Sequence, residues 1–405
     1  MIWTLKKAWY RIFQFCFYEF SKLMNWREPE LLMGAGSIRK LPKMIKGYGL
    51  KNVLVITDRG LTELQLPRVL LNGLEEEGIS YTVFDDVEEN PTIDTIEKAR
   101  KLYLEEGFQG LVAFGGGSPM DAAKAVGARI ARPRKSIEQM GGFLKVRRKL
   151  PPLFAVPTTA GTGSETTIAA VVTDSKTKHK YAISDLNLIP LCAVLDPELT
   201  VGLPPALTAA TAMDAMTHAV ESYITIPWGG DKRCPGMAED AVRLIVANAE
   251  KVYRDSSDLQ ARLNMLLASY YASYAFTRRG LTYGHCIAHT LGGLYRVPHG
   301  LANAVILPHL LEHTGSIIHR QLARLAEVAG LDVEGKSQAE RAEAFIEEIK
   351  RLNRAMGIPE KLDMIKTEDI PRMVAWALKE GNPWYPVPKI FDEKAVTALI
   401  SRIMT

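Results

Sequence analysis

The 405-residue chain is poor in histidine and cysteine, with eight residues of the first kind and four of the second. The cysteines lie far apart and form no CxxC pair: Cys16, Cys192, Cys234 and Cys286. This argues against a disulfide framework and predicts a reducing, cytoplasmic location. The sequence also lacks a long basic stripe, and its net charge is only +4, so we expect no nucleic-acid partner.

The first 29 residues lack an uninterrupted apolar block, although they are rich in aromatic side chains. Four basic residues, Lys6, Lys7, Arg11 and Lys22, interrupt the segment MIWTLKKAWYRIFQFCFYEFSKLMNW, which excludes a membrane-spanning helix. The segment has no signal-peptide cleavage site either. Two alternatives remain open for this arm (residues 1–29). It is a helix that packs on the body or across a dimer interface, or a helix that docks on a membrane surface or a partner.

The length and a change of pattern along the chain predict two domains. Residues 30–205 alternate helix-like segments with short apolar runs, namely NVLVIT, YTVFDDV, GLVAFGGG, LFAVPTT and AVLD. This alternation predicts βαβ units, and therefore a Rossmann-like α/β domain with a parallel sheet. Residues 206–405 instead show long helical patterns, which predict an all-α domain.

Two glycine-rich segments follow strand-like runs and predict a cofactor site. In FGGGSPMDAAK, Ser118 and Pro119 are expected to begin a helix with Asp121 in its first turn, and the helix N-terminus would bind a pyrophosphate. The second segment, PTTAGTGSE, offers hydroxyls for a ribose, a phosphate or an amide. Asp58 ends NVLVITD and can bind a ribose diol, which favours NAD over NADP. The alternative for each segment is an ordinary turn, because GxGxxG is absent.

Three histidines cluster in YGHCIAHTLGGLYRVPHG. His285 and His289 are four residues apart and share a helix face, and His299 follows a proline before the next apolar run. Asp214 and His218 are also four residues apart, in AMDAMTHAVE. One carboxylate and three imidazoles without a thiolate suit Fe(II), and also Zn(II) or Mn(II). The pattern predicts a metal site, although any one of these histidines alone is more often structural.

Together, the motifs GGGSPMDAAK, TTAGTGSE, AMDAMTHAVESY and GHCIAHTLGGLYRVPHGLANAVILP resemble those of the iron-containing (group III) alcohol dehydrogenases, in the butanol-dehydrogenase/alcohol-dehydrogenase branch. The resemblance runs from about Glu30 to the C-terminus, and the aromatic arm is additional to it. It implies the dehydroquinate synthase-like fold of that family. An N-terminal α/β domain would bind NAD(P), a C-terminal all-α domain would bind the metal, and the active site would lie between them.

The resemblance also implies individual site residues. The metal ligands would be Asp214, His218, His285 and His299. His289 would be a catalytic residue near the nicotinamide, as a proton relay or a positioning group. The cofactor-binding residues would be Asp58, Asn90, Gly116, Gly117, Ser118, Asp121, Thr158, Thr159, Thr162, Lys180, Leu199 and Leu203. Cys286 and Ala169 depart from the family pattern, which leaves the identity of the substrate open.

The implied activity is reversible hydride transfer between a short-chain primary alcohol and a nicotinamide. NAD would be preferred to NADP, Fe(II) or Zn(II) would be the metal, and the enzyme would be a homodimer. A bound cation would make deprotonation of the alcohol feasible near neutral pH. The alternatives are a dehydroquinate-synthase-like or glycerol-dehydrogenase-like enzyme on the same scaffold, or a non-catalytic metal or nucleotide sensor that docks through the arm.

Overall fold

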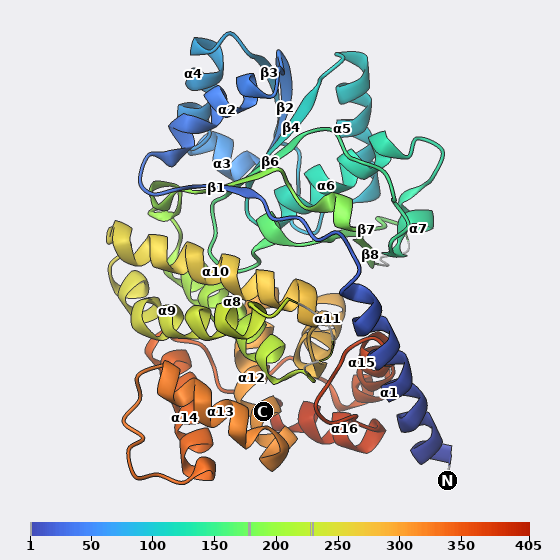
Figure 1. Cartoon of the computed structure of the whole chain (residues 1–405), viewed down its shortest axis with the longest axis vertical. Helices are drawn as coiled ribbons and strands as arrows, with labels where there is room; N and C mark the ends of the chain where they lie inside the picture. Colours follow the sequence, from blue (N-terminus) through green and yellow to red (C-terminus); the bar gives the residue numbers. More distant parts are fainter. Residues whose placement is uncertain (1, 177–179, 227, 229–230) are drawn as a thin grey trace. The chain divides into compact units, whose positions relative to one another are not determined.

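The computed structural model describes residues 2–176, 180–226, 228 and 231–405 and divides the chain into two compact units (Figure 1). One unit is Asn25–Gly202, and the other combines Met1–Met24 with Leu203–Thr405. The greater part of the segment predicted as a separate arm therefore belongs to the unit formed by the C-terminal half. In the described part of the chain, no helix combines the length and the apolar character needed to cross a membrane.

A parallel sheet forms the centre of the unit Asn25–Gly202. Among the described residues it has six strands in the order β1-β9-β6-β4-β2-β3. Their bounds are β1 Glu30–Met33, β2 Asn52–Ile56, β3 Ser80–Phe84, β4 Gly110–Gly115, β6 Leu153–Pro157 and β9 Cys192–Leu195. The five runs read from the sequence are β2, β3, β4, β6 and β9, so the predicted parallel sheet is confirmed, and β1 is an additional edge strand.

Both faces of this sheet are covered by helices, because its strands are apolar on both sides. Leu54 and Leu111 lie in a core with α5 and α6, whereas Val53 and Val112, their neighbours in the sequence, lie in a core with α2 and α4. The helices of this unit are α2 Leu41–Gly47, α3 Arg59–Glu63, α4 Arg68–Glu76, α5 Ile93–Glu105, α6 Gly117–Ala131 and α7 Ile137–Met140. Short 3₁₀ helices are η1 Ser37–Lys40, η2 Ser164–Thr166, η3 Leu186–Leu188 and η4 Pro197–Thr200.

A small second sheet in the same unit was not predicted. It contains β5 Gly142–Phe143, β7 Ala169–Thr173 and β8 Lys180–Ser184 in the order β5-β8-β7, and β7 runs antiparallel to β8. Strand β7 follows the second glycine-rich segment in the chain and packs against α6. Strand β5 has only two residues and β8 begins and ends with a polar residue, whereas β7 lies in a short apolar run, IAAVV, that was not predicted as a strand.

The other unit is mostly helical, as predicted for the second half of the chain. Its helices are α1 Ile2–Ser21, α8 Pro205–Ile224, α9 Cys234–Arg254, α10 Leu259–Arg279, α11 Tyr283–Tyr295, α12 His299–Thr314, α13 His319–Val328, α14 Gln338–Ala355, α15 Ile370–Gly381 and α16 Glu393–Arg402, with 3₁₀ helices η5 Gly315–Ile318 and η6 Thr367–Asp369. Among its described residues, β pairing is limited to the isolated bridge Leu362–Met404.

Two glycines leave room for the contacts of α11 and α12 with residues of α8. A Cβ atom at Gly300 would collide with the carbonyl oxygen of Ala210, so a larger residue there would push α12 away from α8. A Cβ atom at Gly284, on α11, would collide with the carboxylate of Glu221, so a larger residue there would displace that side chain. The two glycines thus preserve the contacts among the helices that carry the clustered histidines.

Candidate metal centre and cofactor loops

Four side chains predicted as metal ligands come together in the mostly helical unit. Asp214 and His218 extend from α8, His285 from α11, and His299 is the first residue of α12. Among the described residues, one ligand atom from each lies within 4.8 Å of all the others. The ring centroids of His218 and His285 are 4.7 Å apart, and those of His285 and His299 are 5.3 Å apart. The packing of α8, α11 and α12 therefore brings the pair Asp214/His218 together with His285 and His299 in one cluster.

The donor atoms of this cluster are arranged to receive a cation. His285 Nδ1 lies 2.7 Å from Glu221 Oε2, so Nδ1 carries the proton and Nε2 keeps a lone pair. Asn303 Nδ2 lies 2.7 Å from Asp214 Oδ1 and 3.1 Å from the Nε2 atoms of His285 and His299. One carboxylate oxygen and two imidazole nitrogens thus surround the electropositive amide group of Asn303. Their lone pairs could equally coordinate a metal ion.

The protonation states in the cluster favour metal binding. Burial opposes ionisation of Asp214, but the neighbouring imidazoles, His218 first, hold its pKa below the usual value. Glu221 behaves in the same way: burial is outweighed by His285, and the pKa of Glu221 is lowered. Burial lowers the pKa of His299 to about 3, so its ring is neutral. Deprotonated donors of this kind are what a metal ion requires.

Two residues of this cluster were not predicted. Glu221 is fully buried on α8 and accepts hydrogen bonds from the backbone nitrogen of Thr282, at 2.9 Å, and from its hydroxyl, at 2.7 Å. Asn303 lies four residues after His299 on α12. Each residue therefore lies on the same helix face as a predicted ligand, since Glu221 follows Asp214 by seven residues. This spacing is the sequence feature from which both could have been predicted.

His289 lies beside the four-residue cluster and outside it. Its ring stacks on His299 with centroids 5.1 Å apart, and its Nδ1 lies 2.7 Å from Glu380 Oε1. The Tyr385 hydroxyl donates to the same carboxylate oxygen at 3.1 Å. Burial opposes ionisation of Glu380, but the neighbouring His289 outweighs it and keeps the pKa of Glu380 below its usual value. His289 therefore has a carboxylate partner on α15.

The two glycine-rich segments lie face to face at the carboxyl ends of adjacent strands, β4 and β6. A Cβ atom at Gly117 would lie only 3.0 Å from Thr162 Cγ2, so the glycine eases the approach of the two segments there. Gly116 faces Thr159, whose Cγ2 a Cβ atom would meet at 3.4 Å, an ordinary contact distance. The structure thus brings four of the predicted cofactor residues together where parallel sheets bind their ligands.

Helix α6 begins earlier than the sequence predicted. Gly116 is its N-cap and Gly117 its first residue, so Ser118 is not the N-cap and Asp121 lies beyond the first turn. The extended backbone of Gly116 makes this earlier start easy. Ser118 Oγ instead accepts a hydrogen bond from the backbone nitrogen of Asn90 at 3.3 Å. No side chain of the described residues caps α6, so its first N–H groups stay available to an anion.

A buried lysine that was not predicted ties the two segments together. Lys124 Nζ donates to Ser164 Oγ at 3.0 Å and to the carbonyl oxygen of Thr167 at 2.9 Å. The carboxylate of Asp121 accepts from Ser164 Oγ and from the backbone nitrogen of Val171, both at 2.9 Å. Both carboxylate oxygens of Asp121 thus accept hydrogen bonds from the protein itself. Through these bonds Asp121 holds the second glycine-rich segment and β7 against α6.

Burial shifts the pKa of each ionisable group in this network toward its neutral form. Burial raises the pKa of Asp121 and raises that of Glu165 to about 7, although the ammonium of Lys124 opposes both shifts. Burial lowers the pKa of Lys124 to about 8, against the attraction of the two carboxylates. Lys124 therefore still carries its proton at neutral pH.

The remaining predicted cofactor residues lie at several different elements of the structure. Asp58 follows β2 and caps α3, where its Oδ1 accepts a backbone N–H at 3.0 Å. Thr158 is buried just after β6, Leu199 is buried in η4, and Leu203 begins the other unit. Lys180 begins β8, and its side chain lies outside the described part of the chain. Their roles toward a cofactor stay predictions.

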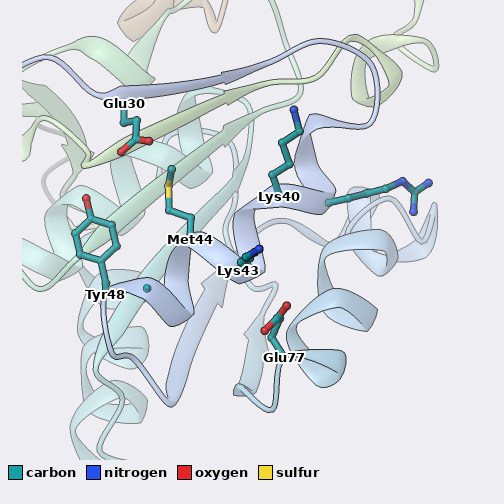
Figure 2. A pocket seen from close by; sticks show the side chains of 8 residues that line it. Glu30, Lys40, Lys43, Met44, Tyr48 and Glu77 are labelled. Carbon is teal, nitrogen blue, oxygen red and sulfur yellow. The ribbon is translucent and has the colours of Figure 1, made fainter.

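A surface pocket of about 680 Å³ lies at the β1 edge of the same unit (Figure 2). Its lining residues are Glu30, Arg39, Lys40, Lys43, Met44, Gly47, Tyr48 and Glu77. Figure 2 shows basic and acidic side chains side by side around it. It contains none of the predicted cofactor or metal residues, and its charged groups are of mixed sign. It therefore adds nothing to the candidate site.

Comparison with known proteins places these features in context. The sequence profile described as iron-containing alcohol dehydrogenase matches residues 29–197, and the profile of the Fe-containing alcohol dehydrogenase family, C-terminal, matches 208–404. The 1,3-propanediol dehydrogenase of Klebsiella pneumoniae is 38% identical over 370 residues, which are 90% of this chain and 95% of that protein. The lactaldehyde reductase of Escherichia coli (strain K12) is 34% identical over 361 residues, 86% and 92% of the two chains. A crystal structure of 1,3-propanediol oxidoreductase matches with a TM-score of 0.90 at 36% identity, covering 94% of this chain and 99% of that one.

Proposed function

The chain belongs to the iron-containing alcohol dehydrogenase family, and on that premise we propose that Asp214, His218, His285 and His299 bind its iron. It is an oxidoreductase that interconverts alcohols and aldehydes with a nicotinamide cofactor. The observation that supports the ligand assignment is the convergence of four donor atoms within 4.8 Å. The Glu221 contact adds to it, because it orients a lone pair of His285 into the cluster.

We propose NAD as the cofactor and assign its pyrophosphate to the N-terminus of α6 between the two glycine-rich segments. A similar structure, sulfoacetaldehyde reductase from Bifidobacterium kashiwanohense, was solved in complex with NAD⁺. Asp58 supports a preference for NAD over NADP, because a carboxylate can bind a ribose diol and would repel a 2′-phosphate. Asn90 is held beside Ser118 and completes the proposed wall of this site.

The chain's own residues supply orientation and proton handling. Bound iron would act as a Lewis acid toward the alcohol or aldehyde oxygen. Glu221 holds the ring of His285 in one tautomer, and Asn303 lies among the ligand atoms. His289 is the candidate for carrying a proton between substrate and solvent, since 43% of its side chain is exposed and Glu380 orients it. Hydride would pass between the carbinol carbon and the nicotinamide, which supplies the redox chemistry.

The substrate class we propose is a short primary alcohol, diol or hydroxyaldehyde. The two relatives named above act, by their names, on 1,3-propanediol and lactaldehyde, which are small and carry two oxygens. Zn(II) remains an alternative metal, because the ligand set accepts it. We further propose a homodimer in the cytoplasm, a setting compatible with the four described cysteines being free.

Removal and replacement of the metal tests the proposed function. Chelator-stripped protein should lose NADH-dependent reduction of 3-hydroxypropanal and lactaldehyde, and anaerobic Fe(II) should restore it, with Zn(II) compared in parallel. If Asp58 accepts hydrogen bonds from the adenosine ribose, turnover with NADPH should be slower than turnover with NADH by about tenfold or more. The measurement is NADH absorbance together with metal content. Full turnover in protein confirmed to contain no metal would contradict the assignment.

Glu380→Gln tests whether His289 handles a proton. We expect kcat to fall about tenfold or more with metal content unchanged, because the ring loses the carboxylate that orients it. The acidic limb of the pH–rate profile for alcohol oxidation should also move to lower pH, since the negative charge beside the ring is gone. His289→Ala should be as slow as the double variant His289→Ala/Glu380→Gln. Additive losses, or loss of metal in His289→Ala, would show that His289 has another role.

A further inference from the structure

Helix α1 faces the body of its unit with its hydrogen-bonding side. Gln14 Nε2 donates to the carbonyl oxygen of Tyr385 at 2.6 Å, and Arg11 donates to the carbonyl oxygens of Val387 at 2.7 Å and Pro388 at 3.1 Å. Gln14 is fully buried by this contact. Figure 1 shows α1 along the outside of the segment that contains α15 and α16. An amphipathic helix on a globular body ordinarily turns its apolar side inward, and here polar groups occupy part of that position.

The opposite side of α1 is apolar and exposed. It carries the outer stripe, defined as Leu5 (65% exposed), Trp9 (57%), Ile12 (58%), Phe20 (55%) and Leu23 (82%). Successive members are three, four or eight residues apart, so they form one line along the helix and the turn that follows it. A continuous apolar stripe in this position marks an interaction surface rather than scattered surface residues.

The charges beside the outer stripe favour one kind of partner. Lys6 and Lys22 are exposed and flank the stripe, whereas Lys7 precedes Arg11 by four residues and Gln14 by seven and so lies on the side that faces the body. Glu19 is the one acidic residue of α1 in the described part of the chain, and it pairs with Lys22 at 2.7 Å. Basic residues next to an apolar, aromatic stripe complement an anionic lipid surface.

An exposed tryptophan of the body continues this surface. Trp384 is 45% exposed and packs edge-on against Phe13 and Phe17 of α1, at centroid distances of 5.0 and 5.8 Å. Tryptophan favours the headgroup region of a bilayer, where its apolar ring and its N–H group are both accommodated. The surface that would meet lipid therefore includes part of the folded body, and α1 need not detach to reach it.

We propose that α1 docks this protein on the surface of a bilayer that contains anionic lipid. The helix lies in the plane of the headgroups, with the outer stripe turned into them and the lysines close to lipid phosphates. The hydrogen bonds of Arg11 and Gln14 keep the rest of the unit attached to the docked helix. This inference concerns where the enzyme works and does not depend on its substrate.

Vesicle flotation with the full chain tests the proposal. Wild type should float with phosphatidylcholine vesicles that contain about a third phosphatidylglycerol, and much less with phosphatidylcholine alone or in high salt. Leu5→Ser/Leu23→Ser should lower the partition coefficient about tenfold or more, because apolar area is lost from the stripe. The matched control is Leu64→Ser/Leu104→Ser, at positions 72% and 53% exposed on the other unit, which should bind like wild type.

Lys6→Gln/Lys22→Gln gives a second, independent measurement. It retains the outer stripe and should weaken binding to anionic vesicles several-fold. Aldehyde reduction and thermal midpoint should match wild type in all three variants, which establishes that they fold. Absence of flotation with anionic vesicles, or flotation that survives Leu5→Ser/Leu23→Ser, overturns the proposal. Self-association that this variant abolishes, without vesicle binding, would identify a second copy as the occupant and also overturn it.

Discussion

His285→Ala should remove bound metal and lower kcat/KM for aldehyde reduction by on the order of a thousandfold or more. The alanine eliminates one of four converging donors and leaves the Glu221 carboxylate buried without its imidazole partner. The wild-type thermal midpoint should rise when Fe(II) or Zn(II) is added, since a ligand that binds only the folded state stabilises it, and the variant should show little rise. Metal analysis and steady-state kinetics on the same preparations check both statements.

Two further variants make the first result specific. Glu221→Gln keeps all four ligands but replaces the charged acceptor at His285 Nδ1, so metal affinity or activity should fall about ten- to a hundredfold. His319→Ala changes a histidine at the start of α13 that lies outside the cluster, and it should retain metal and activity. If His285→Ala bound stoichiometric metal and turned over normally, the ligand assignment would be wrong.

Lys124→Met should lower the free energy of unfolding by about 3 to 5 kcal/mol and weaken NADH binding at the same time. Lys124 is 0% exposed, and methionine of similar length cannot donate to Ser164 Oγ or to the carbonyl oxygens of Thr167 and Ala169, 2.9 to 3.0 Å away. The carboxylate of Asp121 would also lose its neighbouring cation. Urea denaturation and fluorescence titration with NADH measure the two effects.

Lys101→Met is the matched control for this prediction. Its side chain is 73% exposed on α5 and pairs with Glu105 at 3.7 Å, so the change should alter the unfolding free energy by less than about 0.5 kcal/mol. NADH affinity should remain that of wild type. A loss below about 1 kcal/mol in Lys124→Met, with normal NADH binding, would mean that the buried ammonium does not organise the second glycine-rich segment.

Much of the framework follows from local patterns in the sequence. The strands β2, β3, β4, β6 and β9 appear as short apolar runs, because strands buried on both faces must be apolar throughout. The family resemblance is confirmed by profiles that match nearly the whole chain. Strands β1 and β5 have only four and two residues and β8 begins and ends with a polar residue, whereas β7 was missed although its apolar run, IAAVV, is visible in the sequence. The start of α6 was misplaced, since a glycine in an extended conformation can replace a serine as the N-cap.

Some residues of the site can be predicted from their spacing in the sequence, and others are recognised only from their contacts. The pairs Asp214/His218 and His285/His289 are visible as four-residue spacings, because a helix places such residues on one face. The spacings alone do not show which of these residues share a centre, and the ligand set came from the family resemblance. In the structure the contacts among α8, α11 and α12 bring the four predicted ligands together and leave His289 outside the cluster. The partners Glu221, Asn303 and Glu380 become apparent only in three dimensions, since their role is defined by contacts with other helices.

Sequence patterns were sufficient to predict the fold class, the family and the residue types proposed to bind a metal and a nucleotide, because these depend on short motifs and on helical or strand periodicity. The three-dimensional structure was needed to show that Lys124 holds the second glycine-rich segment and which side of α1 faces outward. Periodicity shows that a helix has two unlike sides but does not show which side is covered. That choice depends on acceptors supplied by distant residues, here the carbonyl groups of Tyr385 and Val387.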